Sequence, residues 1–454
     1  MKIGRFAILG ALLAGGCAAS PQVQRLAPAW PAAVREFASP DEAVRVASLF
    51  PNSAGMQRRR LAAALQARDP AAAADSLDRL ARMGAVLSEA ARAQAATLIG
   101  PEAMAPIAAR FAANAAPLAA SLLHASVPAG HELVEGIIWD SAARRLYATT
   151  VVGRALLAVG PGGTSVAAPA GPGSLFGAAY DPDRNWIWVA TASVEQTPKV
   201  EFAFAGLTVF DPDRPLEPRR IPVPAGVTAN PGDVAVARDG TAYASDGLNG
   251  AIYRCRPGCT RLEMLLPPGT FFSAQGLAIS PDQKRLYIAD RRYGLAVLER
   301  AGGRLSLVAG DDGTMLDGID GLAAHGADLI AIQTAYPPAR IVRLRLSADG
   351  LRVERLDVLE RANPEWGEIT LGTVAGDRFL YVADAQWERF GDAGVPVAGK
   401  PALPTPIRSL ELRRPASRQV VGFKAHRPSG PGGGFLSPAS ESRPKSVAMA
   451  GPLP

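Results

Sequence analysis

Four side chains that could bind a metal ion, or act as acid and base, stand at matching places in a repeated phrase of this sequence. Glu135 and Asp320 are carboxylates, Gln275 is an amide, and Asp233 is a third carboxylate. Each stands beside a glycine at the start of an apolar, strand-like stretch. If the fold gathers them, their oxygens suit a hard cation such as Ca²⁺, which takes about 6 to 8 oxygen ligands.

The chemistry of such a site depends on how the repulsion between the carboxylates of Glu135 and Asp320 is relieved. At about 5 Å and an effective dielectric of about 20 they repel by roughly 3 kcal/mol, or about 2 pKa units. A metal would relieve the repulsion, polarise a carbonyl and lower the pKa of bound water, leaving the less engaged carboxylate as base. Without a metal, a shared proton leaves an acid/base pair or a sugar-binding site. A structural role, with both carboxylates bound to backbone amides, is the third alternative.

The phrase that carries these residues is a glycine, apolar positions, a turn rich in Pro, Asp or Gly, and an aromatic strand. It recurs as "EGIIWDSAARRLYATT", "FGAAYDPDRNWIWVAT", "GDVAVARDGTAYASD", "QGLAISPDQKRLYIAD", "DGLAAHGADLIAIQ" and "ITLGTVAGDRFLYVAD". The copies begin 41 to 56 residues apart, which suits four strands per copy. The sequence therefore predicts an all-β six-bladed propeller, with "IRSLELR" completing the last blade.

In a propeller the first strand of each blade runs along the central channel, so the residue before its glycine lies at the channel mouth. The six copies place one residue each in this ring, with Asp233 and Glu368 one position away: Glu135, Phe176, Gly232, Gln275, Asp320 and Ile369. We expect Glu135 and Asp320 to be catalytic. We expect the metal ligands to be Glu135, Gln275, Asp320 and Asp233.

A small α-helical domain is predicted before the propeller. Ser39 with Glu42 forms a capping box, and Asp69-Pro70, Ser88 and Pro101 begin further helices. The helices weakly resemble a tetratricopeptide-like pair, so a protein partner could bind there. The expected organisation is a signal peptide (1–17), a linker (18–38), the helical domain (39–125), the propeller (126–414) and a disordered tail (415–454).

The repeated phrases also resemble a known family. "EGIIWD", "GDVAVARDGTAYASD", "QGLAISPDQKRLYIAD" and "GIDGLA" look like blades of the gluconolactonase, senescence-marker-protein (regucalcin) and luciferin-regenerating-enzyme family. The resemblance covers about Glu135 to Gly394 and implies hydrolysis of lactones or esters with one divalent metal at the channel mouth. The family holds this metal with a Glu, one or more Asn and an Asp. By position, Glu135 matches the Glu and Asp320 the Asp, whereas Gln275 replaces an expected Asn.

The resemblance implies a lactone or ester hydrolase with a divalent cation, Ca²⁺ by preference, and a small lactone, ester or sugar-like ligand. The alternative is a non-catalytic propeller scaffold that binds a peptide, glycan or protein. His131 is a conceivable base, and Tyr253, Trp366 and Trp387 could line a sugar site.

Other chemistries lack their sequence signals. No G-x-S-x-G elbow and no glycine-rich phosphate loop between strand and helix occurs. The net charge of +6 would allow nucleic-acid binding, but none of the nucleic-acid-binding modules is present. We therefore expect no nucleic-acid partner.

Cys255 and Cys259 stand in "YRCRPGCTR", where Arg-Pro-Gly reads as a tight turn between two strands. Export from the cytoplasm makes a disulfide plausible there. Zinc is the competing interpretation, but the four histidines show no metal spacing near this pair. A local disulfide is the prediction.

The first residues, "MKIGRFAILGALLAGGCAAS", have the layout of a secretory signal peptide. The small residues before Cys17 resemble a bacterial lipoprotein cleavage box, and a plain cleavable signal is the alternative. The resemblance implies a lipid on Cys17. With Ala18 following, it also implies a periplasmic protein anchored in the outer membrane, with no other membrane contact.

Lipidation can be tested directly. Globomycin, which blocks lipoprotein signal cleavage, is expected to leave an unprocessed precursor of slower electrophoretic mobility, and Cys17→Ser is expected to abolish labelling by a radioactive fatty acid. Unchanged mobility under globomycin would support a plain cleavable signal instead.

Overall fold

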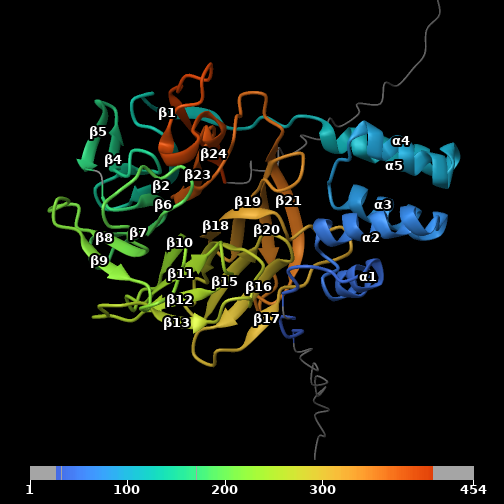
Figure 1. Cartoon of the computed structure of the whole chain (residues 1–454), viewed down its shortest axis with the longest axis horizontal. Helices are drawn as coiled ribbons and strands as arrows, with labels where there is room; N and C mark the ends of the chain where they lie inside the picture. The colour runs from blue at the N-terminus through green and yellow to red at the C-terminus, as the bar shows by residue number, and fades with distance from the viewer. Residues whose placement is uncertain (1–26, 32, 170, 413–454) are drawn as a thin grey trace, which may run out of the picture. The chain divides into compact units, whose positions relative to one another are not determined.

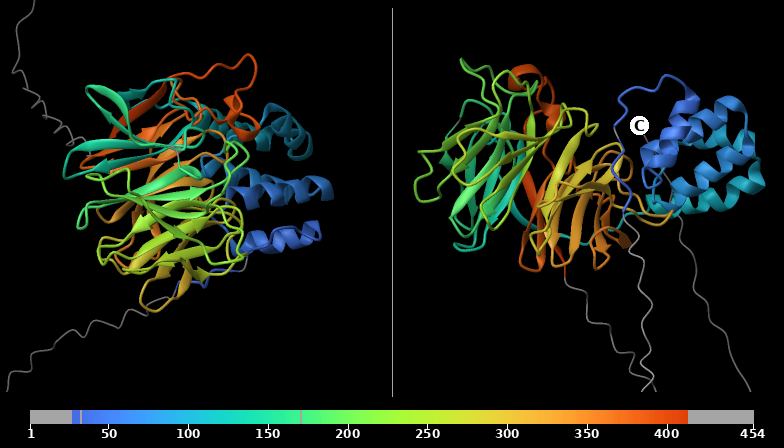
Figure 2. Two further views of the ribbon diagram at one scale, coloured as in Figure 1. Left: turned by 60° about the vertical axis from the view of Figure 1, so that its left-hand side comes forward. Right: turned by 90° about the horizontal axis from the view of Figure 1, so that it is seen from below.

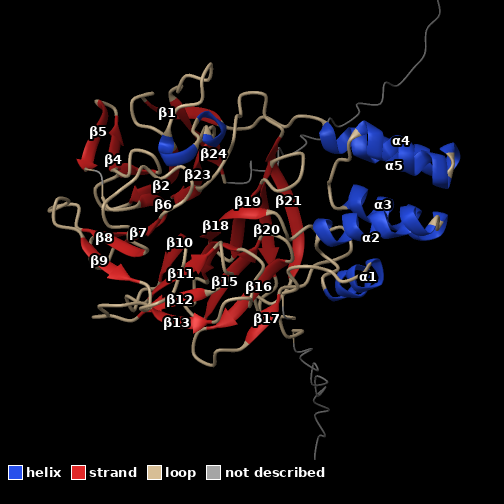
Figure 3. Cartoon of the chain, viewed as in Figure 1, coloured by secondary structure: helices blue, strands red, loops and turns tan. Residues whose placement is uncertain are grey.

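The computed structural model describes residues 27–31, 33–169 and 171–412 (Figure 1). Strands of this part form six four-stranded antiparallel sheets, so the predicted six-bladed propeller is confirmed. A group of five helices precedes it in the chain (Figure 3). No helix of the described part is long and apolar enough to cross a bilayer. The predicted signal peptide, Cys17 and the tail 415–454 lie outside the described residues.

The first three blades each use four consecutive strands, written here from the channel outward. Blade 1 contains β2 (Val134–Asp140), β3 (Arg145–Thr150), β4 (Leu156–Gly160) and β5 (Gly163–Ala168). Blade 2 contains β6 (Ser174–Asp181), β7 (Trp186–Ala192), β8 (Gly206–Phe210) and β9 (Arg219–Pro222). Blade 3 contains β10 (Pro231–Val236), β11 (Ala242–Asp246), β12 (Ile252–Cys255) and β13 (Glu263–Leu266).

Blades 4 and 5 repeat this order, and blade 6 takes one strand from the other end of the chain. Blade 4 contains β14 (Ala274–Ile279), β15 (Arg285–Asp290), β16 (Gly294–Glu299) and β17 (Leu305–Leu307). Blade 5 contains β18 (Ile319–His325), β19 (Asp328–Gln333), β20 (Arg340–Leu346) and β21 (Val353–Arg361). Blade 6 contains β22 (Gly372–Ala375), β23 (Arg378–Val382), β24 (Thr405–Glu411) and, outermost, β1 (Leu122–Val127).

The pairing of β1 with β24 closes the ring. The register runs from Leu122 opposite Ser409 to Val127 opposite Thr405. Neighbouring inner strands contact one another in turn, and β22 contacts β2, so the circle is complete. The propeller thus begins at β1, a few residues before the predicted start at 126, because the strand that closes blade 6 precedes the first repeated phrase.

A buried polar network holds this closing strand in place. Glu360 of blade 5 accepts hydrogen bonds from the amide (3.2 Å) and hydroxyl (2.8 Å) of Ser121 and from the hydroxyl of Tyr381 (2.8 Å). Arg408 of β24 donates to the carbonyl of Ser121 at 2.7 Å. Because unpaired buried polar groups are costly, this network favours one position for the chain just before β1.

The helical region comprises five helices, seen in further orientations in Figure 2. They are α1 (Pro40–Leu49), α2 (Ala54–Ala67), α3 (Pro70–Arg82), α4 (Glu89–Ile99) and α5 (Pro101–Ala115). Ser39, Asp69 and Ser88 cap α1, α3 and α4 through their side chains, at the positions expected from the sequence. The shared core of these helices includes Leu77, Leu80 and Phe111.

A propeller carboxylate caps the helix α2. Asp317, in the loop before β18, accepts hydrogen bonds from Ala54 N (2.9 Å), Gly55 N (2.8 Å) and Ser53 Oγ (2.8 Å). Helix N-termini favour negative charge because their first amides have no partner within the helix. This contact therefore joins the helical region to blade 5.

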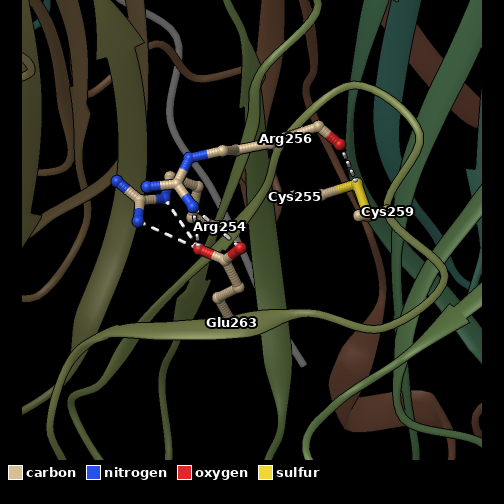
Figure 4. Close-up of a disulfide and its surroundings, with 5 residues drawn as sticks. All are labelled: Arg254, Cys255, Arg256, Cys259 and Glu263. Carbon is tan, nitrogen blue, oxygen red and sulfur yellow. Dashed lines mark hydrogen bonds and ion pairs between the residues drawn. A yellow bond between two sulfur atoms is a disulfide. The ribbon is translucent and has the colours of Figure 1, made fainter.

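Cys255 and Cys259 form a disulfide with a Cα to Cα distance of 5.6 Å (Figure 4). It spans the turn after β12. Beside it, Arg254 and Arg256 both pair with Glu263, at 2.9 and 3.0 Å. The disulfide closes the turn after β12, and the ion pairs link this end of β12 to β13 in blade 3.

Replacing Asp317 tests how the helical region is held. Asp317→Ala leaves two buried amides of α2 without an acceptor, whereas the Ser53 hydroxyl keeps the Arg292 carbonyl as acceptor at 2.7 Å. We therefore expect the free energy of unfolding to fall by about 3 kcal/mol. Denaturant unfolding measures this loss.

The matched control is Asp312→Ala, because the Asp312 side chain is 57% exposed and, in the described part of the chain, its only polar contact is an ion pair with Arg79. Its expected loss is below about 0.5 kcal/mol. Equal losses in the two variants would contradict the capping role.

Candidate functional site

A cavity of about 670 Å³ lies at the channel mouth, and all six blades contribute to its lining. Every residue of the predicted ring lines it: Glu135, Phe176, Gly232, Gln275, Asp320 and Ile369, together with Asp233 and Glu368. Side chains far apart in the sequence therefore meet in one site, as the repeat predicts.

Local backbone irregularities turn the ring residues toward the cavity. The register between the first and second strands shifts between Val134 and Ile137 in blade 1, and between Ala274 and Leu277 in blade 4. Such a bulge sets two residues against one and re-aims a side chain. In both of these blades the ring residue and its glycine stand inside the shift.

In blades 1, 2 and 4 the glycine of the phrase is required by the neighbouring blade. A Cβ on Gly136 would lie 2.8 Å from the carbonyl oxygen of Phe176, and one on Gly276 would lie 2.6 Å from the amide nitrogen of Leu322. Both distances are too short for a carbon atom, so only glycine allows adjacent inner strands to pack this closely. These glycines in the sequence therefore indicate where inner strands pack closely around the axis.

Glu135 is held by one hydrogen bond and lies in a poorly solvated place. The indole N–H of Trp387 donates to its Oε2 at 2.8 Å. Burial raises the pKa of Glu135 to about 8, and the Asp320 and Glu368 carboxylates add to this, whereas the Trp387 bond and Arg291 lower it. Its Oε1 has no hydrogen-bond partner among the described residues.

Asp320 is fully engaged by two neighbours. The guanidinium of Arg291 donates to its Oδ1, and the hydroxyl of Thr334 donates to its Oδ2. Burial nevertheless raises the pKa of Asp320 to about 6, because the opposing effect of Arg291 is smaller than the loss of solvation. Arg291 therefore supplies the positive charge of the mouth.

The side chains of Asp233 and Gln275 form hydrogen bonds with neighbouring protein groups. The Asp233 carboxylate accepts from the amide of Leu277 at 2.8 Å, which links blade 3 to blade 4. Burial raises its pKa to about 7, and the backbone hydrogen bonds lower it. The Gln275 amide donates to the hydroxyl of Ser273 at 2.8 Å.

These contacts decide how the predicted metal ligands fit a calcium ion. Both carboxylate oxygens of Asp320 are engaged, and Glu135 and Asp233 each have one oxygen engaged. Phe176 and Gly232 contribute no side-chain oxygen. In the described part of the chain, no three His, Cys, Asp or Glu side chains are grouped so as to hold a metal ion. The predicted ligands thus share one cavity without forming a calcium ligand set, because Arg291 already occupies Asp320.

The sequence analysis did not assign Arg291 or Thr334 to the site, and it considered Trp387 only as a residue of a sugar site. Arg291 and Thr334 directly follow the second strands of blades 4 and 5, which end at Asp290 and Gln333. Gly247 has the same place after β11 and also lines the cavity. A second ring of positions, one residue past each second strand, would have located the first two.

The other sequence candidates lie elsewhere. His131 is not among the residues that line the cavity in the described part. Tyr253 is fully buried in its blade, and the indole of Trp366 donates to the hydroxyl of Tyr381 at 2.8 Å. Of the three aromatic residues considered for a sugar site, Trp387 lines the cavity, where its ring lies nearly parallel to Phe176.

Comparisons with known proteins find similarity only among solved structures. No protein-family model and no curated protein matches the chain. A gluconolactonase from Xanthomonas campestris has 20% identity and a TM-score of 0.42, covering 66% of this chain and 92% of its own. A calcium-binding regucalcin from Agrobacterium tumefaciens has 16% identity and a TM-score of 0.44, covering 64% of this chain and 96% of its own.

A third solved structure is a PQQ-bound aldose sugar dehydrogenase from Streptomyces coelicolor. It has 18% identity and a TM-score of 0.43, covering 65% of this chain and 99% of its own. Similarities of this size carry no argument about activity, so the site has to be interpreted from its own residues.

Replacing Arg291 tests whether it acts as the resident cation of the mouth. We expect millimolar calcium to leave the thermal unfolding midpoint of the unaltered protein unchanged. Arg291→Gln is expected to lose about 2 kcal/mol of stability because it leaves Asp320 near two other carboxylates without a counter-charge. Calcium should restore part of this loss.

Arg345→Gln is the control, since Arg345 pairs with Asp357 (2.7 Å) on the outer strands of blade 5. It should show no response to calcium. Stabilisation of the unaltered protein by calcium would mean that the ion binds beside Arg291 and that the fit described above is wrong.

Proposed function

We propose that the channel mouth binds a small lactone or ester and hydrolyses it without a metal ion. One observation carries this: a guanidinium fixed by Asp320 shares a cavity with the unengaged oxygen of Glu135. A positive group can stabilise the developing oxyanion, and a free carboxylate oxygen can take a proton from the attacking water, so together they can accelerate ester hydrolysis.

Arg291 would polarise the substrate carbonyl. One of its terminal nitrogens is bound to Asp320, and its remaining N–H groups have no protein acceptor among the described residues. They can donate to the carbonyl oxygen, which becomes negative as the tetrahedral intermediate forms. Asp320 and Thr334 act as positioning residues, because they hold the guanidinium in one orientation.

Glu135 would act as general base and then as general acid. The oxygen of a water molecule attacks the carbonyl carbon while Oε1 of Glu135 takes a proton from it. When the intermediate collapses, the bond between the carbonyl carbon and the alkoxy oxygen breaks, and Glu135 returns the proton to that oxygen. The products are a carboxylic acid and an alcohol, joined in one hydroxy acid when the substrate is a lactone.

The cavity walls favour a polar substrate with some apolar surface. Trp387 and Phe176 form an aromatic wall beside Glu135, and Trp387 also orients its carboxylate. Faces of sugar rings pack well on aromatic rings, so a sugar-like lactone suits this wall.

Three predictions from the sequence concern the cofactor, the location and the partner of this proposed enzyme. Calcium dependence has no part in the proposed steps, because the residues present do not form a calcium ligand set. The lipid anchor at Cys17 and the periplasmic location remain proposals supported by the signal sequence alone. A protein partner at the helical region likewise rests on the sequence.

The proposed base predicts a pH profile. Glu135 must be ionised, so with its pKa of about 8 the rate should rise as pH increases through that value. Glu135→Gln should lower kcat/KM by about 10²-fold or more and remove this rise. The measurement is hydrolysis of a panel of five- and six-membered lactones and aryl esters, followed by pH-stat or chromogenic assay.

Glu354→Gln is the control, because Glu354 lies exposed on β21 in blade 5. It should keep the unaltered profile. A panel on which the protein shows no hydrolysis above background, with binding of sugar-like ligands retained, would replace the enzyme by a binding scaffold.

A further inference from the structure

Three arginines form a basic cluster at the rim of the mouth cavity. Arg35 precedes α1, Arg59 lies on α2, and Arg292 follows Arg291 in the turn between β15 and β16. Two of the three therefore come from the helical part of the chain, whose role the repeat does not explain.

Contacts with a cavity residue place the cluster at the rim. Arg35 donates from Nη2 to the carbonyl of Leu248 at 3.3 Å, and Leu248 lines the cavity. Arg292 donates from Nη1 to the carbonyl of Arg35 at 2.9 Å. Their guanidinium carbons lie 5.8 and 3.3 Å from the ring centroid of Phe272.

Arg59 completes the cluster from the other side. Its guanidinium carbon lies 4.6 Å from the ring centroid of Phe37, which is a cation–π contact. Arg59 is close enough to Arg292 to lower its pKa, although burial is the larger cause of that shift. Like charges so near one another repel, so a bound anion would stabilise the cluster.

In the described part of the chain the cluster lacks a paired carboxylate, and the buried Asp290 only opposes the lowering of the Arg292 pKa. None of Arg35, Arg59 and Arg292 takes part in an ion pair with a carboxylate there, whereas Arg45 of α1 and Arg60 of α2 pair with Glu42 and Asp75.

We propose that this cluster is a subsite for an anionic group carried by the substrate: a carboxylate, sulfate or phosphate some distance from the carbonyl that is attacked. Planar guanidinium groups bind such oxyanions through paired N–H donors. The inference rests on the proposed hydrolysis in the same cavity and adds the class of substrate. It also gives the helical region a function, which is to bring Arg35 and Arg59 to the mouth.

The test compares two aryl esters of equal chain length. The anionic probe is the mono-4-nitrophenyl ester of adipic acid, and the neutral probe is 4-nitrophenyl hexanoate. We expect kcat/KM to favour the anionic ester by about tenfold at low salt, chiefly through KM. This preference should shrink toward unity at high salt, where exposed charges are screened.

The variant Arg35→Gln/Arg59→Gln should lose the preference. The charge-matched control is Arg45→Gln/Arg214→Gln, whose two side chains are 66% and 72% exposed and lie in other ion pairs. It should keep the preference. Equal kcat/KM values for the two esters in the unaltered protein, or an unchanged ratio in the cluster variant, would overturn the subsite.

A binding measurement separates this inference from the proposed function. If neither ester is hydrolysed, the hydrolase proposal fails, and calorimetry with adipate decides the subsite on its own. Adipate binding that weakens about tenfold in the cluster variant and not in the control would support the subsite. Adipate that binds neither the unaltered protein nor the control would refute it.

Discussion

The pairing of β1 with β24 is the interaction on which the rest of the propeller depends. Five blades form from consecutive strands, but the sixth is complete only when the strand before the first repeat adds to its outer edge. Backbone hydrogen bonds supply the pairing, and the buried Glu360 network fixes the approach to it. Only a closed ring sets β22 against β2 and so surrounds the mouth cavity with protein.

Closure of the ring also brings the inner strands close together around the axis, and this close packing fixes the positions of the side chains in the site. Glycines at the start of the inner strands let neighbouring blades touch, and the bulges there aim the adjacent side chains inward. Hydrogen bonds between blades then hold the ring. Thr149 donates to the Phe176 carbonyl at 2.7 Å, and Thr370 donates to the Glu135 carbonyl at 2.8 Å.

The charges at the mouth are balanced within the chain. Carboxylates gathered by a propeller repel unless a positive group or a proton intervenes. Here Arg291 intervenes at Asp320, while burial keeps the pKa of Glu135 high. Charge is balanced at the reacting centre but not at the rim, because Arg35, Arg59 and Arg292 form no ion pair with any carboxylate that the structure describes.

The sequence alone determined the architecture and the position of the site. The repeated phrase defines the inner strand of every blade, since alternating apolar residues and turn signals act locally, and it placed Glu135 and Asp320 at one mouth. Capping residues such as Ser39 likewise located helix starts from local chemistry.

Only the tertiary structure decided what the site contains. Arg291 meets Asp320 across two blades, and Trp387 reaches Glu135 from a loop of blade 6. Spacing along the chain says which residues share a ring, but it does not say which side chains touch across it. Those contacts depend on how the blades twist and how the loops fold over the mouth. Only the folded structure therefore shows that protein N–H and O–H groups already bind carboxylate oxygens that a cation would need.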